Sequence, residues 1–323
     1  MLNYNSKPLL FALVFIHSLF SSSQGQLLVG FYSQTCPTAE SIVHSVVDEN
    51  FKRDPGNPAV LLRLQFHDCF VKGCDGSILI NNGAEGERGA RGNLGVGGYE
   101  IIEEAKKMLE SVCPGVVSCA DIVALAARDA VSLVNGQFYE VPTGRRDGRV
   151  SSKSLAANLP DVDDSIQLLK SRFQQKGLSD RDLVLLSGGA HTIGLTACFF
   201  MQKRLYNFTP SGGSDPSIDP GFLRELKANC PFNGDPNVKI PLDPVTEFKF
   251  DDQVFVNIKN GFAVIASDAR LYDDNNTRQI LESYIGSGQN FLADFAKAMV
   301  KMGKIGVKTG SQGEIRRVCS NVN

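Results

Sequence analysis

The sequence has no excess of charge of either sign. Its 33 lysines and arginines nearly balance its 35 aspartates and glutamates, which gives a formal net charge of −2 and an isoelectric point near 6.1. A near-neutral chain has no electrostatic reason to bind nucleic acid or an anionic membrane surface. We therefore exclude functions that depend on a basic patch, and expect neither nucleic acid nor a membrane among the partners.

Long apolar runs are missing beyond the N-terminus. The one such run, residues 9–20, is too short for a transmembrane helix. Lys7 precedes it and small or polar residues follow it, which is typical of a secretory signal peptide. We predict a signal peptide at residues 1–25, cleaved before Gln26, and one exported domain at residues 26–323.

The chain also lacks a C-x-x-C pair and has only four histidines, which disfavours a zinc site. An even number of cysteines in an exported chain favours four disulfides instead. Their spacing alone leaves the pairing open. The eight cysteines are Cys36, Cys69, Cys74, Cys113, Cys119, Cys198, Cys230 and Cys319.

Two glycosylation sequons are present, at Asn207 and Asn275, each with threonine two residues later. Acceptor asparagines of this kind usually lie on surface loops of secreted proteins. We expect both asparagines on such loops, as candidate glycosylation sites.

Strand-like alternation is scarce, and helical periodicity predominates. Apolar residues at helical spacing predict helices over residues 123–134, 164–176 and 291–302. Loops rich in Gly, Pro and Asp, above all residues 209–221 and 229–244, separate the helices without a repeat or a low-complexity linker. The sequence therefore predicts a mainly α protein that forms one unit.

Arg63 and His67 stand four residues apart in the otherwise apolar run 61–70. On a helix this spacing places both side chains on one face, one turn apart. A guanidinium keeps its charge when buried, whereas an imidazole exchanges a proton near neutral pH. The pair suits chemistry in which a proton moves while negative charge develops. The alternative is a structural pair, with Arg63 bonded to a carboxylate and His67 to a backbone carbonyl.

Oxygen-bearing side chains cluster directly after this run. Asp68, Asp75 and Ser77 lie within ten positions of one another on a predicted turn. Carboxylates, hydroxyls and backbone carbonyls are the ligands of Ca²⁺, whereas Mg²⁺ requires stricter octahedral geometry. The EF-hand pattern is absent, and an ordinary solvated loop is the alternative. A second oxygen-rich stretch occupies residues 243–251.

Two longer runs carry a resemblance to a known family. Residues 64–77 read LQFHDCFVKGCDGS, and residues 188–194 read GGAHTIG. They closely resemble the distal and proximal histidine signatures of the secretory plant haem peroxidases, known as class III. Shorter matches occur in the family's order at residues 117–121, 144–147, 158–160 and 204–208.

The resemblance, which extends from Gln26 to Cys319, implies the haem-peroxidase fold. In that fold two helical halves, distal and proximal, enclose one haem b with little β structure. The implied function is a secreted enzyme that reduces H₂O₂ and oxidises phenolic donors by successive one-electron steps through a ferryl intermediate. We expect a monomer in the extracellular space or cell wall rather than the vacuole. The physiological donor and the biological role stay open.

The resemblance assigns the two histidines to opposite faces of the haem. His191 matches the proximal ligand of the haem iron, and Asp268 matches the carboxylate that accepts its hydrogen bond. On the distal side, His67 would move the proton of the peroxide and Arg63 would stabilise the developing charge. Asn93 matches the residue that holds the other ring nitrogen of His67.

Further matches concern the donor site and two calcium ions per chain. Pro160 matches a proline at the exposed haem edge where aromatic donors bind, and Glu87 matches the acid that links Asn93 to the distal calcium. The implied distal ligands are Asp68, Asp75, Ser77 and the carbonyls of Val71 and Gly73. The implied proximal ligands are Thr192, Asp243, Thr246 and Asp251, with Lys249 as a carbonyl donor.

The family also implies a pairing of the cysteines. The pairs are Cys36–Cys113, Cys69–Cys74, Cys119–Cys319 and Cys198–Cys230. The Cys69–Cys74 bridge would hold the calcium turn that follows His67, so losing the bridge or the ion should loosen the catalytic helix.

Several positions depart from the family pattern. The run before His191 is one residue longer than usual, so we expect a local bulge or a longer turn there. The chain has no tryptophan, and Tyr139 stands where many relatives carry their single one. Leu242 stands where some members have phenylalanine on the proximal side, and Arg91 and Asp161 bring charges to the expected donor entrance.

Two other functions are compatible with the sequence. The first is a secreted haem- and calcium-binding wall protein with a structural or binding role and incidental peroxidase activity. The second is a metal hydrolase built on His67 and Asp68. Turnover of a phenol with peroxide distinguishes a peroxidase from the wall protein. The absorption spectrum of a bound haem excludes the metal hydrolase.

Overall fold

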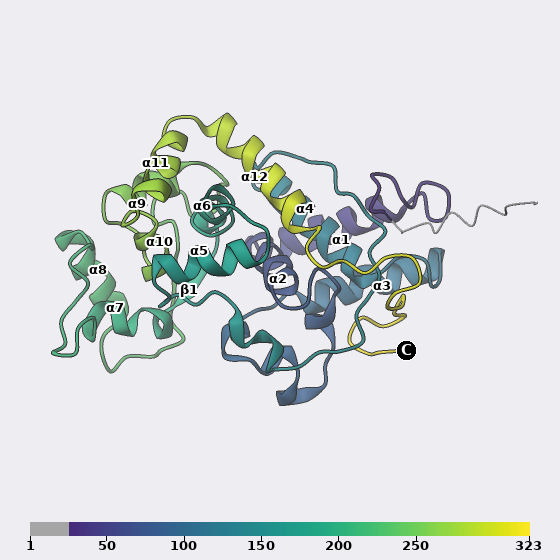
Figure 1. Cartoon of the computed structure of the whole chain (residues 1–323), viewed down its shortest axis with the longest axis horizontal. Helices are drawn as coiled ribbons and strands as arrows, with labels where there is room; N and C mark the ends of the chain where they lie inside the picture. The colour runs from purple at the N-terminus through teal and green to yellow at the C-terminus, as the bar shows by residue number, and fades with distance from the viewer. Residues whose placement is uncertain (1–25) are drawn as a thin grey trace, which may run out of the picture.

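Helices dominate the computed structural model, which describes residues 26–323 (Figure 1). The signal peptide predicted at residues 1–25 lies outside the described residues. The α-helices are α1 (Ala39–Arg53), α2 (Asn57–Phe70), α3 (Tyr99–Val112), α4 (Cys119–Leu133), α5 (Ile166–Gln175), α6 (Asp180–Leu186), α7 (Gln202–Tyr206), α8 (Pro220–Asn229), α9 (Gln253–Lys259), α10 (Ala266–Arg270), α11 (Asn275–Tyr284) and α12 (Gly288–Met302). The mainly α prediction is confirmed.

The β structure of the described chain is a single short ribbon. Strands β1 (Leu195–Ala197) and β2 (Lys239–Pro241) pair antiparallel, with Thr196 opposite Ile240. The prediction of a plain loop over residues 229–244 is therefore wrong at β2. Three residues are too few for an alternating pattern to be visible in the sequence, and the pairing depends on a partner strand distant in the chain.

The three predicted helices are present with small shifts at their ends. The predicted helix at residues 123–134 begins earlier, at Cys119, because the Ser118 hydroxyl accepts a hydrogen bond from the Asp121 N–H. Helix α5 begins at Ile166, because Ser165 caps it in the same way. Side-chain caps thus decide where these helices start.

The distal half is built around α2. Helix α4 packs against both α1 and α2, and α3 packs against α1 and α4 (Figure 1). Most α2 side chains are buried, including Leu61, Leu64 and Phe70. Helix α2 is therefore enclosed on most sides, and its polar residues are held at fixed positions.

The proximal half packs α6, α9, α11 and α12 around an aromatic cluster. The rings of Phe255 and Phe291 meet edge to face with their centroids 5.0 Å apart, and Phe250 lies tilted against Phe295 at 4.6 Å. A separate, smaller core under α7 and α8 contains Met201, Leu205, Phe222 and Leu226. Figure 1 shows α7 and α8 at the end of the molecule farthest from α1 and α3.

All eight cysteines form disulfides in the pairing implied by the family resemblance. The bridges are Cys36–Cys113, Cys69–Cys74, Cys119–Cys319 and Cys198–Cys230. The Cys119–Cys319 bridge joins the start of α4 to the C-terminal segment across 200 residues of sequence. In the chain-entropy model a bridge over so long a loop restricts the unfolded chain most, by about 5 kcal/mol.

Buried ion pairs fasten the segment after α12 to the distal half. Arg145 lies 2.7 Å from the Asp121 carboxylate and donates to the Gly303 carbonyl at 2.9 Å. Arg316 donates to the carbonyls of Gly76 and Cys319. Removing one partner of a buried pair leaves the other charge uncompensated, so these contacts favour one arrangement of the chain.

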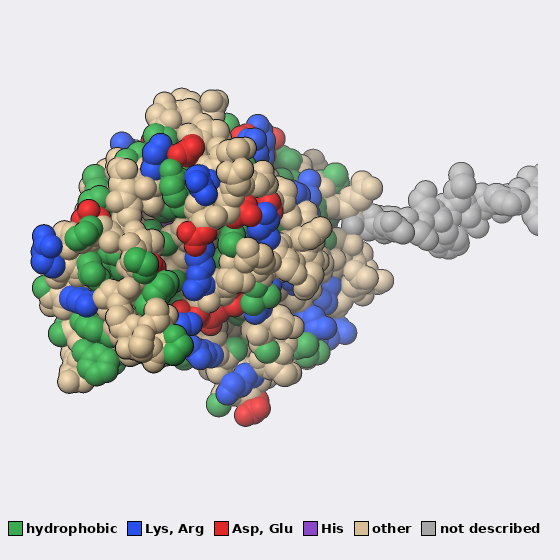
Figure 2. All heavy atoms as spheres, turned by 60° about the vertical axis from the view of Figure 1, so that its left-hand side comes forward, with side chains coloured by type: hydrophobic (Ala, Val, Ile, Leu, Met, Phe, Trp, Pro, Cys, Tyr) green, Lys and Arg blue, Asp and Glu red, His purple; other side chains and the backbone are tan. Residues whose placement is uncertain are grey.

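The surface carries both signs of charge. On the face shown in Figure 2, acidic and basic side chains are interspersed, as the near-neutral composition predicts. Within residues 26–323 no helix combines the length and the apolar character needed to cross a bilayer.

Both sequon asparagines are exposed, but Asn275 is the first residue of α11 and does not lie on a loop. The loop prediction is wrong there, because the Asp274 side chain caps a helix at this point.

Candidate active site

A cavity of about 360 Å³ separates α2 from the segment that follows α6. Arg63, Phe66 and His67 line it from α2, and His191 lines it from the opposite side. The remaining walls are largely apolar and include Leu169, Leu186, Ala190, Met299 and Met302. Both predicted histidines therefore line the same cavity, one from α2 and the other from the segment after α6.

Helix α2 places Arg63 and His67 on one face, as their spacing predicts. Arg63 Nε donates to His67 Nε2 at 3.2 Å, and Arg63 Nη2 donates to the Leu94 carbonyl at 3.1 Å. No carboxylate between residues 26 and 323 forms an ion pair with Arg63. The alternative of a structural pair with a carboxylate and a backbone carbonyl as partners is therefore wrong. The Leu94 carbonyl was not predictable, since no spacing pattern marks a backbone acceptor.

Asn93 fixes the orientation of the distal imidazole. Its side-chain oxygen lies 2.7 Å from His67 Nδ1, and its amide nitrogen donates to the Glu87 carbonyl at 2.7 Å. Since an amide oxygen only accepts, Nδ1 carries the proton and Nε2 keeps its lone pair, which accepts the hydrogen bond from Arg63 Nε. Glu87 supports Asn93 through its backbone carbonyl, whereas the resemblance implied a link through the acid.

The surroundings keep His67 neutral. Burial, together with the charges of Arg63 and His191, lowers the pKa of His67 to about 3, although the hydrogen bond with Asn93 raises it. The imidazole is therefore unprotonated at neutral pH and can accept a proton.

On the opposite side, His191 lies on a short 3₁₀ turn. Helix α6 ends at Leu186, and the turn η6 (Gly189–Thr192) follows it. A Cβ atom on Gly189 would lie 2.9 Å from Phe291 Cε2, and one on Gly188 would lie 2.7 Å from Leu271 Cδ1. The turn is packed so closely against Phe291 and Leu271 that a side chain at either glycine would force its neighbours to shift.

A carboxylate holds the second nitrogen of this imidazole. His191 Nδ1 lies 2.9 Å from each Asp268 oxygen, and Asp268 is buried on α10. Helix α10 is steadied in turn by Arg204, which donates to the Ile265 carbonyl at 3.0 Å. The predicted pair is thus brought together across 77 residues of sequence.

Comparison with known proteins identifies the family. The model of the peroxidase family matches residues 43–287. Peroxidase 43 of Arabidopsis thaliana is 62% identical over 317 residues, which is 97% of each chain, and Peroxidase 13 of the same plant is 59% identical over 98% of each chain. Peroxidase N1 of Nicotiana tabacum is 50% identical over 91% of this chain and 90% of its own. The chain belongs to the class III plant haem peroxidases.

The peroxidase is thus an enzyme whose family uses haem, H₂O₂ and a reducing donor. Pro160 and the two charged residues Arg91 and Asp161 line the same cavity as the histidines. Leu242 also lines this cavity.

Tyr139, which stands where many relatives carry their single tryptophan, is buried, and its hydroxyl has no hydrogen-bond partner among residues 26–323.

The predicted distal calcium residues meet at the turn after α2. The Asp68 carboxylate accepts from the Gly76 N–H at 2.9 Å, and burial, with the neighbouring Asp75, raises its pKa. The Ser77 hydroxyl and both Glu87 carboxylate oxygens are buried without a hydrogen-bond partner in the described part of the peroxidase. Burial raises the pKa of Glu87 to about 7. Unpaired buried oxygens of this kind fit a bound ion or an ordered water.

Two lysines that the sequence did not single out approach this turn. Lys308 forms an ion pair with Asp75, and Lys176 donates to the Val71 carbonyl at 2.9 Å. Both lie more than 100 residues from their partners, so no local pattern could indicate them. Each places an ammonium group on a predicted ligand of the distal calcium.

The predicted proximal calcium residues are gathered more tightly. The Thr192 hydroxyl donates to the carbonyls of Asp251, at 2.8 Å, and Lys249, at 3.2 Å. The Thr246 hydroxyl lies between the carboxylates of Asp243 and Asp251, at 3.2 and 3.0 Å. All five residues therefore converge, although they come from two segments far apart in the sequence.

Neither turn is a cluster of metal-binding side chains alone. Between residues 26 and 323 no three His, Cys, Asp or Glu side chains meet as a metal-binding group. A calcium ion at either turn would need hydroxyl and carbonyl oxygens as well, which is the usual ligand set of Ca²⁺. A metal hydrolase built on His67 and Asp68 receives no support, because His67 bonds to Asn93 while Asp68 bonds to the backbone of its own turn.

Proposed function

We propose that this peroxidase is an exported enzyme that uses H₂O₂ to oxidise phenolic donors in successive one-electron steps. One observation carries the proposal above the others. Two imidazoles face one cavity, and their Nδ1 atoms are bonded to an amide on one side and to a carboxylate on the other. The two rings are thereby suited to different tasks.

The proximal residues fit one haem b. With its Nδ1 held by Asp268, His191 has only Nε2 free, and this nitrogen would hold the haem iron and be made more electron-rich by the carboxylate. The apolar walls suit a flat, largely apolar macrocycle. When bound, haem would supply the redox chemistry.

The distal residues move protons and stabilise charge. His67 Nε2 is unprotonated and would accept the first proton of the peroxide, then return it to the departing oxygen. Arg63, one helical turn away, would stabilise the negative charge that develops as the O–O bond breaks. Arg63 Nε donates to His67 Nε2 at 3.2 Å, so this hydrogen bond would have to be released before Nε2 could accept the peroxide proton.

We propose Pro160 as part of the donor site and two calcium ions as structural cofactors. The five proximal residues offer a nearly complete oxygen set. The distal turn offers Asp68, Asp75, Ser77 and the carbonyls of Val71 and Gly73, but binding there requires Lys308 to release Asp75.

Four disulfides fit export through an oxidising compartment. We propose a monomer acting in the extracellular space or cell wall.

The decisive experiment is turnover of a simple phenol with H₂O₂ by the haem- and calcium-loaded protein, combined with stopped-flow measurement of the peroxide step. Arg63→Leu should slow that step roughly a hundred- to a thousandfold while the haem absorbance band persists. Arg224→Leu, which changes an exposed arginine on α8 outside the cavity, should leave it unchanged.

Each outcome has a clear meaning. An unchanged peroxide step in Arg63→Leu would defeat the distal mechanism. Absence of phenol turnover by the loaded wild type would favour the alternative of a wall protein with a binding role.

A further inference from the structure

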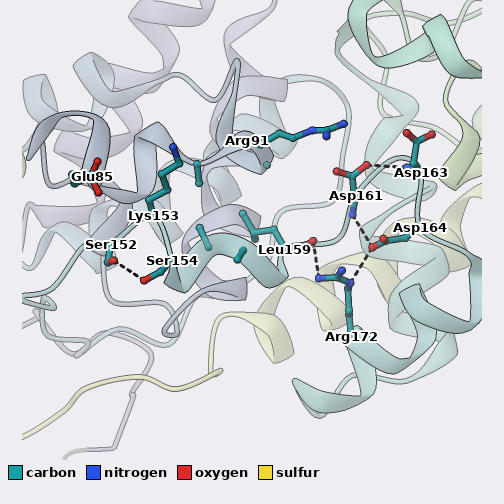
Figure 3. A pocket seen from close by; sticks show the side chains of 14 residues that line it. Glu85, Arg91, Ser152, Lys153, Ser154, Leu159, Asp161, Asp163, Asp164 and Arg172 are labelled. Atoms are coloured by element: carbon teal, nitrogen blue, oxygen red, sulfur yellow. Dashed lines mark hydrogen bonds and ion pairs between the residues drawn. The ribbon is translucent and has the colours of Figure 1, made fainter.

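A second cavity, of about 760 Å³, adjoins the entrance of the histidine cavity (Figure 3). The two cavities share Arg91, Gly92 and Asp161 as lining residues, with Pro160 directly before Asp161 in the chain. A Cβ atom on Gly92 would lie 3.2 Å from Leu159 Cδ1, so the two walls of the entrance nearly touch at this point. A molecule bound at this shared boundary would therefore lie next to both cavities.

Several charged groups of the second cavity have partners within the protein. Arg172 pairs with Asp164 at 2.9 Å and donates to the Leu159 carbonyl, and Lys203 lies 3.8 Å from Asp163. Asp161 turns its carboxylate back onto its own loop, where it accepts from the Asp163 N–H at 3.0 Å. These acids are therefore partly or fully compensated from within the protein.

Arg91 is different. Its guanidinium is exposed and has neither an ion pair nor a side-chain hydrogen bond within residues 26–323, and Figure 3 shows it extending across the entrance toward the Asp161 side. Its backbone is fixed, because η4 (Arg91–Asn93) also carries the asparagine that holds His67. Arg91 thus presents an uncommitted cation from a rigid support at the boundary of the two cavities.

We propose that Arg91 is a specificity-determining residue that binds a carboxylate on the aromatic donor. The proposal rests on the proposed function, in which a phenolic ring is oxidised in the histidine cavity. A guanidinium presents paired N–H donors that match a carboxylate, and such charge-assisted bonds are stronger than neutral ones. The donor class is a phenol with an anionic tail, such as a hydroxycinnamate. Asp161, on the opposite wall, opposes the same tail by repulsion.

The test compares 4-hydroxycinnamate with its methyl ester, which differs in the charge of the tail. The readout is the ratio of kcat/KM for the anion to kcat/KM for the ester. Arg91→Gln should lower this ratio roughly five- to tenfold, and Arg91→Lys should restore part of it. Asp161→Asn should change the ratio in the opposite direction, by about two- to fivefold. Arg224→Gln, with the same charge change on α8, should leave the ratio unchanged.

Binding gives a second readout that does not require turnover. Calorimetry with 4-methoxycinnamate, which has no phenolic hydrogen to lose, should show a dissociation constant about tenfold higher for Arg91→Gln than for wild type. Loss of phenol turnover with this binding difference intact would refute the proposed function and keep Arg91 as the anion site. If Arg91→Gln changes neither the ratio nor the dissociation constant, or if Asp161→Asn shifts the ratio in the same direction as Arg91→Gln, the assignment is overturned.

Discussion

The two faces of the histidine cavity use the same ring atom in different ways. His67 Nδ1 is bonded to the amide oxygen of Asn93, and His191 Nδ1 is bonded to the carboxylate of Asp268. A neutral amide fixes the tautomer of the imidazole without adding charge. A carboxylate attracts the Nδ1 proton and so increases the electron density on the opposite ring nitrogen, Nε2. One partner therefore suits an acid–base catalyst, and the other suits a metal ligand.

The faces differ in their backbone as well. His67 lies in a helix of 14 residues that is buried among α1 and α4, while His191 lies on a turn of four residues between α6 and β1. A long enclosed helix positions a catalytic pair through packing. The short turn depends instead on two glycines and on the Asp268 hydrogen bond.

The largest effect is expected from removing the distal imidazole. His67→Leu should slow the peroxide step roughly a thousandfold, because it removes the imidazole nitrogen that would accept the peroxide proton. Stopped-flow mixing with H₂O₂ measures the step. His44→Leu, at an exposed histidine on α1, serves as the matched control. A rate within tenfold of wild type for His67→Leu would remove the functional difference between the faces.

Asp268→Asn makes the proximal pair resemble the distal one. It should weaken haem retention or peroxide reactivity by about ten- to a hundredfold, since an amide does not increase the electron density on His191 Nε2 as the carboxylate does. Transfer of haem to a competing apoprotein measures retention, with Asp48→Asn on α1 as control. Unaltered transfer and reactivity would mean that the carboxylate does not tune the ligand.

Asn93→Asp makes the reverse change on the distal side. A carboxylate beside Nδ1 would stabilise the imidazolium, so the pKa of His67 should rise from its lowered value by about one to two units. The peroxide step needs the neutral ring and is lost as pH falls through this pKa, so its acid limb should move to higher pH. A pH profile of the step measures the shift, with the exposed Asn290→Asp as control. A limb that stays in place would contradict the assigned tautomer.

The smallest effect concerns the proximal turn. Gly189→Ala should destabilise the protein by about 1–3 kcal/mol, because the added methyl would lie 2.9 Å from the Phe291 ring. Gly288→Ala, whose methyl would first meet an atom at 3.5 Å, should be nearly neutral. Urea unfolding followed by circular dichroism compares the two. Equal midpoints would show that the turn has room to relax.

The distal face was largely predictable from the sequence. The four-residue spacing of Arg63 and His67 needs only a helix to bring the side chains together, and the surrounding apolar run supplies that helix. The cysteine pairing followed from the family resemblance and not from spacing. Asn93, 26 residues from His67, likewise needed the resemblance.

Other contacts lay beyond any local pattern. Lys308 reaches Asp75 across 233 residues, and Arg63 uses a backbone carbonyl that no side-chain motif marks. The position of Asn275 at a helix start depends on a single cap, and β2 depends on pairing with β1. Long-range packing and backbone acceptors decide these features, and periodicity does not report them.

The central claim is that His191 holds the haem while His67 stays free on the other side. The direct measurement is the absorption spectrum of haem-loaded wild type, His67→Gln and His191→Gln. We predict that the spectrum of a histidine-ligated haem persists in His67→Gln and is lost in His191→Gln. Loss in His67→Gln with persistence in His191→Gln would contradict the assignment of the two faces.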